Sequence, residues 1–138
     1  MKLKAKQVIT LLFIPLIMSS CATYHMSTQS LLEQFANTQK EKKVNYLVAF
    51  PYFVFPGRVE GNSLKAIKVL DKSRNETTIK VTNRTGVRIT KKDGKRNTFY
   101  FDTLIIQDST ITGKKDHFFG FNIKPINLKD IQKIELQR

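Results

Sequence analysis

Hydrophobic and polar residues alternate with a period of two along most of the chain after Gly57. Such alternation predicts β-strands with one buried face, and the short polar segments between the runs favour hairpins. In the last segment, Leu128, Ile131 and Ile134 also fit a helical spacing, but a turn near 127–130 before a strand agrees better with the preceding segments. The expected strands are 66–70, 77–82, 86–90, 98–101, 104–106, 109–112 and 131–137, with a further short strand at Phe121 and Ile123.

These short strands predict a mainly β domain over residues 44–138, folded as a small antiparallel barrel or sandwich. Asp93 and Gly94 lie between two of the strands. The Asp-Gly pair is typical of a tight hairpin turn in which both central residues have positive φ.

A continuous apolar run, Tyr46 to Phe55, precedes these strands and is interrupted by Pro51. Ten residues are too few for a transmembrane helix. We favour a strand buried on both faces, with an edge or bulge at Pro51 and Pro56. The alternative is an exposed loop that enters lipid or contacts a partner.

A short helix is expected over residues 31–41. Ser30 and Glu33 have the spacing of a capping box, and an apolar stripe that includes Leu31 and Phe35 follows. We favour packing of this helix on the domain or a frayed stalk over an amphipathic helix lying on a membrane. The polar residues 22–29 before it are interpreted as a flexible tether.

The N-terminal residues have the anatomy of a secretory signal peptide. Three Lys come before an eleven-residue apolar run, Val8 to Met18, and the small residues Ser19 and Ser20 follow. The run is too short for a stable membrane span. Cys21, the only cysteine, comes immediately after. An ordinary signal peptide or an uncleaved anchor with an incidental Cys is the alternative.

The sequence Met18-Ser19-Ser20-Cys21 resembles a bacterial lipobox, with Met18 where Leu is most common. The resemblance implies cleavage between Ser20 and Cys21, a diacylglycerol on the Cys21 thiol and acylation, such as with palmitate, of its new amine. Residues 1–20 would then be removed, and residues 21–43 would hold the lipidated Cys, the tether and the helix. Two or three acyl chains hold a protein on a membrane almost permanently.

Taken whole, the chain resembles small lipoproteins of Bacteroidetes-type bacteria. The resemblance rests on the lipobox, on an expected turn at 57–63 and on the run Asp108 to Gly113. It implies no activity. The absence of acidic residues directly after Cys21 favours the outer membrane, with the domain facing the periplasm. Residues 86–137 are similar to an SH3-like or Sm-like barrel, which implies that any ligand binds on its surface or loops.

The chain is strongly basic, with a formal net charge of +13. A basic cluster at the 86–101 hairpin is the candidate contact for an anionic surface such as lipid phosphate. Nucleic acid is not expected as the partner, because the chain is predicted to be exported. A solvated basic face is the alternative. The cluster consists of Arg84, Arg88, Lys91, Lys92, Lys95 and Arg96.

Catalytic and metal-binding patterns are missing from the sequence. One Cys and two His, without ligand spacing, predict no metal site and no cofactor. Neither a pair of Asp102 with Asp108 nor His117 beside Asp116 makes a recognisable catalytic motif. We therefore expect a non-enzymatic envelope lipoprotein that contacts lipid or another envelope protein. The alternative is an envelope carbohydrate-binding module or small hydrolase that uses the aromatic segments 46–55 and 117–121.

Overall fold

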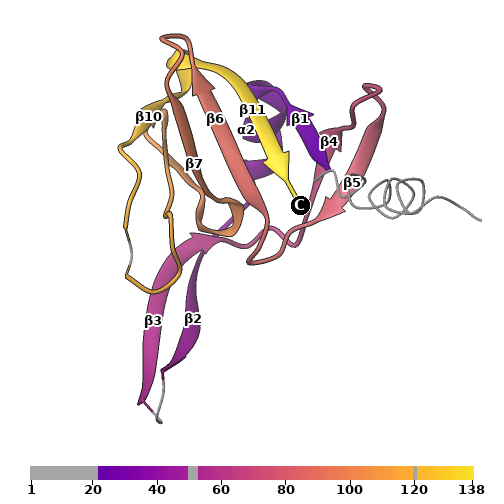
Figure 1. The fold of residues 1–138 in the computed structure, drawn as a ribbon. Helices are drawn as coiled ribbons and strands as arrows, with labels where there is room; N and C mark the ends of the chain where they lie inside the picture. Colours follow the sequence, from indigo (N-terminus) through magenta and orange to yellow (C-terminus); the bar gives the residue numbers. More distant parts are fainter. Residues whose placement is uncertain (1–21, 50–52, 120) are drawn as a thin grey trace, which may run out of the picture.

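The computed structural model describes residues 22–49, 53–119 and 121–138, and its centre is a six-stranded antiparallel sheet (Figure 1). The predicted mainly β, antiparallel class is therefore confirmed. The described strands do not close into a barrel, because β5 and β7 remain as the two edges of this sheet, so the barrel alternative is wrong. The strands lie in the order β5 (Glu76–Lys80), β4 (Ala66–Leu70), β1 (Thr23–Met26), β11 (Ile131–Gln137), β6 (Gly86–Lys91) and β7 (Arg96–Tyr100).

Strand β1 corrects the expectation of a flexible tether at residues 22–29. It lies in the middle of the sheet, where Thr23 pairs with Gln137 and Met26 with Ile134 of β11. Its four residues alternate: Met26 is buried and Tyr24 packs against the core. Four residues of alternation are too short a signal to predict a strand from sequence.

Helix α2 (Thr28–Phe35) is earlier and shorter than the predicted 31–41. Its N-cap is Ser27, whose hydroxyl accepts a 3.0 Å hydrogen bond from the Ser30 amide, so the expected cap at Ser30 is wrong. Leu31 and Phe35 are buried, and packing of the helix on the domain is confirmed.

The side chain of Gln34 joins this helix to strand β4. Its Nε2 donates to the Lys68 carbonyl at 3.0 Å, and its Oε1 accepts from the Lys68 amide at 2.7 Å. One amide side chain thus bonds both a donor and an acceptor of the strand backbone.

A second, three-stranded sheet completes the core. It contains β8 (Ile105–Gln107), β9 (Thr110–Thr112) and β10 (Ile126–Asn127). Two 3₁₀ turns, η2 (Phe101–Thr103) and η3 (Leu128–Asp130), lead from β7 toward β8 and from β10 into β11. Both sheets and α2 contribute to one buried cluster, whose members include Leu31, Phe35, Ile67, Val87, Ile89, Phe101, Ile111, Ile126, Ile134 and Leu136.

Asp93 and Gly94 do not form the expected tight turn with positive φ at both central residues. Only Gly94 has a positive φ there, 82°, in a loop that the Lys91 amide closes on the Lys95 carbonyl at 2.9 Å. Asp108 and Ser109, between β8 and β9, have φ values of 49° and 62°. This pair forms the two-residue turn with positive φ at both positions, which suits the twist of a hairpin.

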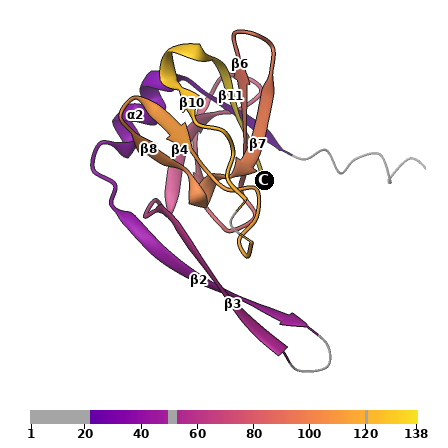
Figure 2. The same ribbon diagram turned by 90° about the vertical axis from the view of Figure 1, so that its left-hand side faces the viewer.

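Strands β2 (Lys40–Ala49) and β3 (Phe53–Asn62) form a separate two-stranded hairpin that projects from the body (Figures 1 and 2). The apolar run 46–55 is thus divided between two paired strands and does not form the single buried strand that we favoured. Pro51 lies outside the described residues, and Pro56 pairs with Tyr46. The expected turn at 57–63 is also wrong, because residues 57–62 continue β3.

Candidate functional site

A buried carboxylate and an imidazole meet where the hairpin joins the body. Asp102 lies in η2 and His117 in the loop after β9, and both are at least nine-tenths buried. The Nε2 atom of His117 lies 2.9 and 3.0 Å from the two carboxylate oxygens of Asp102. The Tyr100 ring packs on the imidazole with a centroid distance of 4.3 Å. The sequence offered no signal for this pair, whose members are 15 residues apart.

The base of the hairpin rests directly on this pair. Lys43 of β2 donates to the Asp102 backbone carbonyl at 2.9 Å, and its ammonium lies 3.7 Å from the Asp102 carboxylate. Two glycines of β3 allow the close approach. A Cβ at Gly61 would lie 1.9 Å from the Asp102 carbonyl oxygen, and a Cβ at Gly57 would lie 2.7 Å from that of His117.

Asn62, at the end of β3, holds the other side of the junction between the hairpin and the body. Its amide donates to the carbonyls of Phe101 and Leu104 at 2.8 and 3.0 Å, and its oxygen accepts from the Leu64 amide. This side chain is 3% exposed and fully bonded, so it positions η2 against the hairpin. Sequence reasoning did not single it out.

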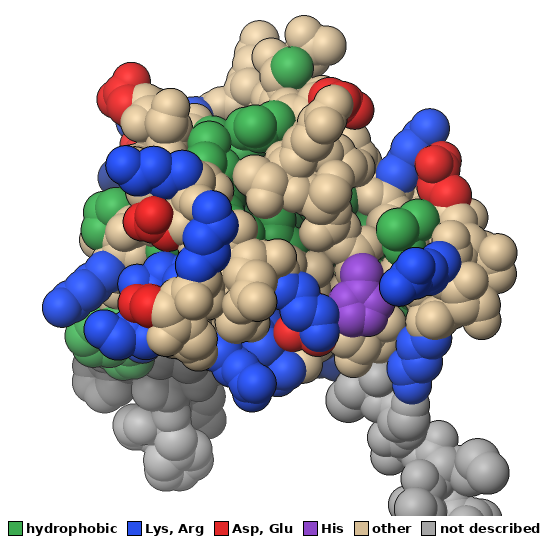
Figure 3. All heavy atoms as spheres, turned by 90° about the horizontal axis from the view of Figure 1, so that it is seen from above, with side chains coloured by type: hydrophobic (Ala, Val, Ile, Leu, Met, Phe, Trp, Pro, Cys, Tyr) green, Lys and Arg blue, Asp and Glu red, His purple; other side chains and the backbone are tan. Residues whose placement is uncertain are grey.

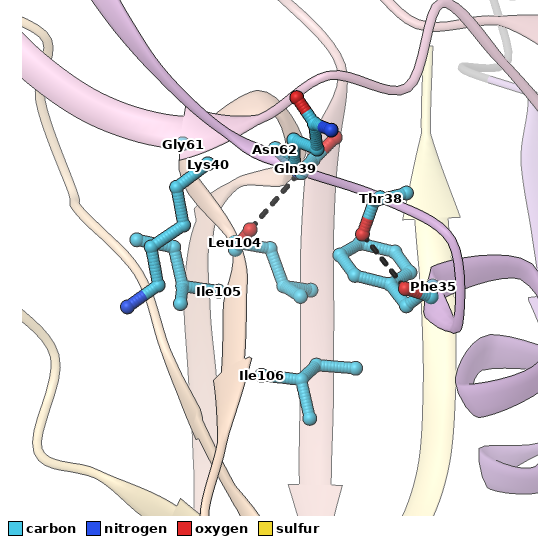
Figure 4. A pocket seen from close by; sticks show the side chains of 9 residues that line it. All are labelled: Phe35, Thr38, Gln39, Lys40, Gly61, Asn62, Leu104, Ile105 and Ile106. Carbon is cyan, nitrogen blue, oxygen red and sulfur yellow. Dashed lines mark hydrogen bonds between the residues drawn. The ribbon is translucent and has the colours of Figure 1, made fainter.

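Beside Asn62 lies a small cavity of about 110 Å³ (Figure 4). Figure 4 shows the Asn62 amide bonded to the Leu104 carbonyl, while Thr38 bonds back to Phe35. Typical ligand pockets hold about 300–1,000 Å³, so this cavity has room for a few waters and not for a sugar chain. It is lined by Phe35, Thr38, Gln39, Lys40, Gly61, Asn62, Leu104, Ile105 and Ile106.

Three exposed phenylalanines follow His117 and form what we call the aromatic loop: Phe118, Phe119 and Phe121. Their exposed fractions are 37%, 76% and 64%, and the rings of Phe119 and Phe121 lie 6.0 Å apart. The carboxylate of Asp116 accepts hydrogen bonds from all three backbone amides, two of them at 2.9 Å. The loop is therefore internally bonded, and it presents apolar rings to the surroundings.

Asp108 and Asp116, the other acidic residues considered in the sequence, do not join the Asp102–His117 pair. Asp108 sits in the β8–β9 turn, and Asp116 organises the aromatic loop. His117 bonds Asp102 and not its neighbour Asp116 in the sequence. Within the described residues, no group of three or more His, Cys, Asp or Glu is placed to hold a metal ion.

The predicted basic cluster is spread along the β6–β7 hairpin. Arg84 precedes β6, Arg88 lies in its middle, and Lys91, Lys92, Lys95 and Arg96 surround the turn at its far end. Figure 3 shows basic side chains interspersed with acidic ones on the face seen from above.

Two carboxylates lie among these cations. Asp93 accepts from the Lys95 amide and lies 3.2 Å from the Lys91 ammonium, and these contacts lower the pKa of Asp93. Glu135 lies opposite Arg88 on β6 and opposite His25 on β1. The Lys133 ammonium, 2.7 Å from the carboxylate, lowers the pKa of Glu135, with smaller contributions from Arg88 and His25.

Ser20 and Cys21 lie outside the described residues. No helix in the described part of the chain combines the length and the hydrophobicity needed to cross a bilayer. Strand β1 begins at Thr23, two residues after Cys21.

Comparison with protein-family models, with curated proteins and with solved structures finds no match to this chain.

Proposed function

We propose that this protein is a non-catalytic envelope lipoprotein, held by lipid on Cys21 to the outer membrane and facing the periplasm, whose β-domain contacts envelope lipid or protein. The position of β1 supports this arrangement. Because Thr23 already belongs to the central sheet, only Ala22 separates the lipidated residue from the folded domain. The domain would thus lie directly against the membrane.

The observation that carries the contact function is the aromatic loop. Its three phenylalanines are exposed, and the backbone that bears them is bonded to Asp116 and follows the buried His117–Asp102 pair. A loop that is ordered before binding loses less conformational entropy on binding. Apolar rings held in this way suit a lipid or protein surface.

The buried acid has a structural role in this proposal. Asp102 is engaged by His117 and Lys43, and its side chain is 7% exposed, which leaves little access for a substrate. The proposal includes no catalytic residue, metal or cofactor. The basic residues of the β6–β7 hairpin add attraction to anionic lipid, which Asp93 and Glu135 partly offset. A relation to SH3-like or Sm-like proteins stays a prediction.

Metabolic labelling with palmitate, followed by membrane fractionation, tests the anchor. The native chain should carry label in the outer membrane fraction, and Cys21→Ala should carry none. Ser20→Ala is the matched control, because it keeps a small residue before the Cys and should still be labelled. Label that persists in Cys21→Ala, or that is missing from the native chain, would overturn the proposal.

The second candidate is an envelope carbohydrate-binding module or small hydrolase, which the Asp102–His117 pair favours, because a carboxylate that holds an imidazole can orient a general base. Titration with soluble glycan fragments, followed by NMR, separates the two candidates. Shifts centred on Tyr100 and His117 would support the glycan site. Shifts confined to the aromatic loop on titration with lipid micelles would support the lipoprotein proposal.

A further inference from the structure

A cavity of about 460 Å³ lies where β1, β11 and the turn between β4 and β5 meet. Ligand pockets usually hold about 300–1,000 Å³, so this cavity has room for a small polar group. Its described lining combines three cationic side chains with one imidazole and one carboxylate. We call it the basic cavity, and it is lined by His25, Leu70, Asp71, Lys72, Arg74 and Lys133.

Arg74 has a backbone conformation that is rare for its residue type. Its φ is 64°, in the left-handed region that glycine and asparagine favour. The turn 71–75 is closed around Asp71, whose Oδ1 accepts hydrogen bonds from the amides of Ser73 and Asn75 at 2.8 and 2.9 Å. The Arg74 amide donates to the Asp71 carbonyl at 3.0 Å. These bonds hold Arg74 at the cavity, and a strained residue in such a place points to a function.

The charges around the basic cavity favour an anion. The Asp71 carboxylate is engaged by the amides of its own turn. Glu135, which pairs with His25 across the sheet, lies 2.7 Å from the Lys133 ammonium, but the Lys133 side chain is still 50% exposed. Within the described residues, no ion pair includes the exposed Arg74 guanidinium. Its planar N–H groups are available to a phosphate, which a guanidinium can bind through two parallel hydrogen bonds.

The basic cavity lies close to the proposed lipid attachment. A neighbouring cavity of about 300 Å³ shares two of its residues and is lined by Ala22, Thr23, Tyr24, Asp71, Lys72 and Ser73. Cys21 and Thr23 are two residues apart, so their Cα atoms are separated by at most about 7 Å. The headgroup layer on each side of a bilayer is about 5–8 Å thick. Lipid on Cys21 would therefore bring the basic cavity to the depth of the lipid phosphates.

We propose that the basic cavity binds the phosphate of an anionic lipid in the membrane that holds Cys21. This inference rests on the proposed lipoprotein function and adds the position and chemistry of one lipid contact. Arg74 donates to the phosphate oxygens, and the ammonium groups of Lys72 and Lys133 add positive charge around them. The acyl chains and the cavity then form two points of attachment, which restrict how the domain tilts on the membrane.

Titration with a short-chain anionic lipid tests the site. The lipid-modified protein, in micelles of the uncharged detergent dodecyl maltoside, is titrated with dihexanoyl phosphatidylglycerol and followed by NMR. The signals of the Arg74 side chain and of the amides in the turn 71–75 should shift and saturate. Arg74→Gln should weaken binding at least about fivefold. Arg84→Gln is the matched control and should leave binding unchanged, because it removes the same charge from an exposed arginine outside the cavity lining.

Arg74→Gly separates binding from folding. Glycine adopts a positive φ without strain, so this variant should melt at a higher temperature than the native chain. It should nevertheless bind dihexanoyl phosphatidylglycerol as weakly as Arg74→Gln, because both lack the guanidinium.

Absence of saturable shifts at Arg74, or an equal loss of binding in Arg84→Gln, would overturn the inference. Inorganic phosphate that binds as tightly as the lipid would also overturn it, because the cavity would then be a site for free phosphate. Palmitate labelling of the native chain tests the anchor separately in every case. Failure of this inference can therefore be distinguished from failure of the proposed function.

Discussion

Replacing His117 with Ala removes the imidazole from the buried carboxylate of Asp102. The two Asp102 oxygens lose contacts of 2.9 and 3.0 Å and keep the Lys43 ammonium at 3.7 Å. An unsatisfied buried acceptor costs about 1–3 kcal/mol, and loss of the ring contact with Tyr100 costs about 1 kcal/mol. We therefore expect His117→Ala to lower the free energy of unfolding by about 3 kcal/mol.

Urea denaturation followed by circular dichroism measures this loss. With a denaturant slope of about 1.5 kcal/mol per molar, the midpoint should fall by about 2 M. His25→Ala is the control, because His25 is only partly buried on β1, and its effect should stay below about 0.5 kcal/mol.

A double-mutant cycle with Asp102→Asn isolates the pair. The two substitutions should couple by at least about 1 kcal/mol, because they remove the same contact. The reasoning is refuted if the two costs simply add, or if His117→Ala costs no more than His25→Ala.

Three further substitutions follow from backbone geometry and charge. Gly61→Ala should lower the free energy of unfolding by about 2–3 kcal/mol, because its Cβ would meet the Asp102 carbonyl. Gly86→Ala is the near-neutral control in the same urea assay, because a Cβ there would lie 3.9 Å from the Cβ of Gln137, an ordinary contact distance. Ser109→Gly should raise the melting temperature and stabilise the fold by about 0.5 kcal/mol, since Ser109 has a φ of 62°. Lys133 lowers the pKa of Glu135 in the folded protein. The ionised Glu135 therefore stabilises the fold at pH values above its unfolded pKa of about 4.3, and this stabilisation is lost as the pH falls through the lower pKa of the folded state. Glu135→Gln should therefore reduce the difference between stabilities measured at about pH 7 and about pH 3, and an unchanged difference would contradict this assignment.

The body strands could be predicted because one face of each is buried. The pattern over residues 66–70 matched β4 at both ends, and the predicted turn near 127–130 followed by a strand over 131–137 is confirmed by η3 and β11. Alternation persists there because the large sheet has one face on the core and the other toward water. Burial on one face makes apolar and polar residues alternate along a strand, and this alternation can be seen in a single sequence.

The elements that were missed depend on contacts between distant residues. β1 is a strand because it lies between β4 and β11, and its partners in β11 are more than a hundred residues away. The apolar run 46–55 gave no sign that its two halves pair with each other, because a continuous apolar run has no period to read. Asp102 and His117 were each noted, but only the path of the chain brings them together.

The pairing of β1 with β11 also governs when this chain can fold. Strand β1 can pair with β11 only after residues 131–137 have been synthesised, and such long-range pairing is intrinsically slow. Loss of the final eight residues would leave β1 and β6 without the strand between them, so a prematurely terminated product would not fold.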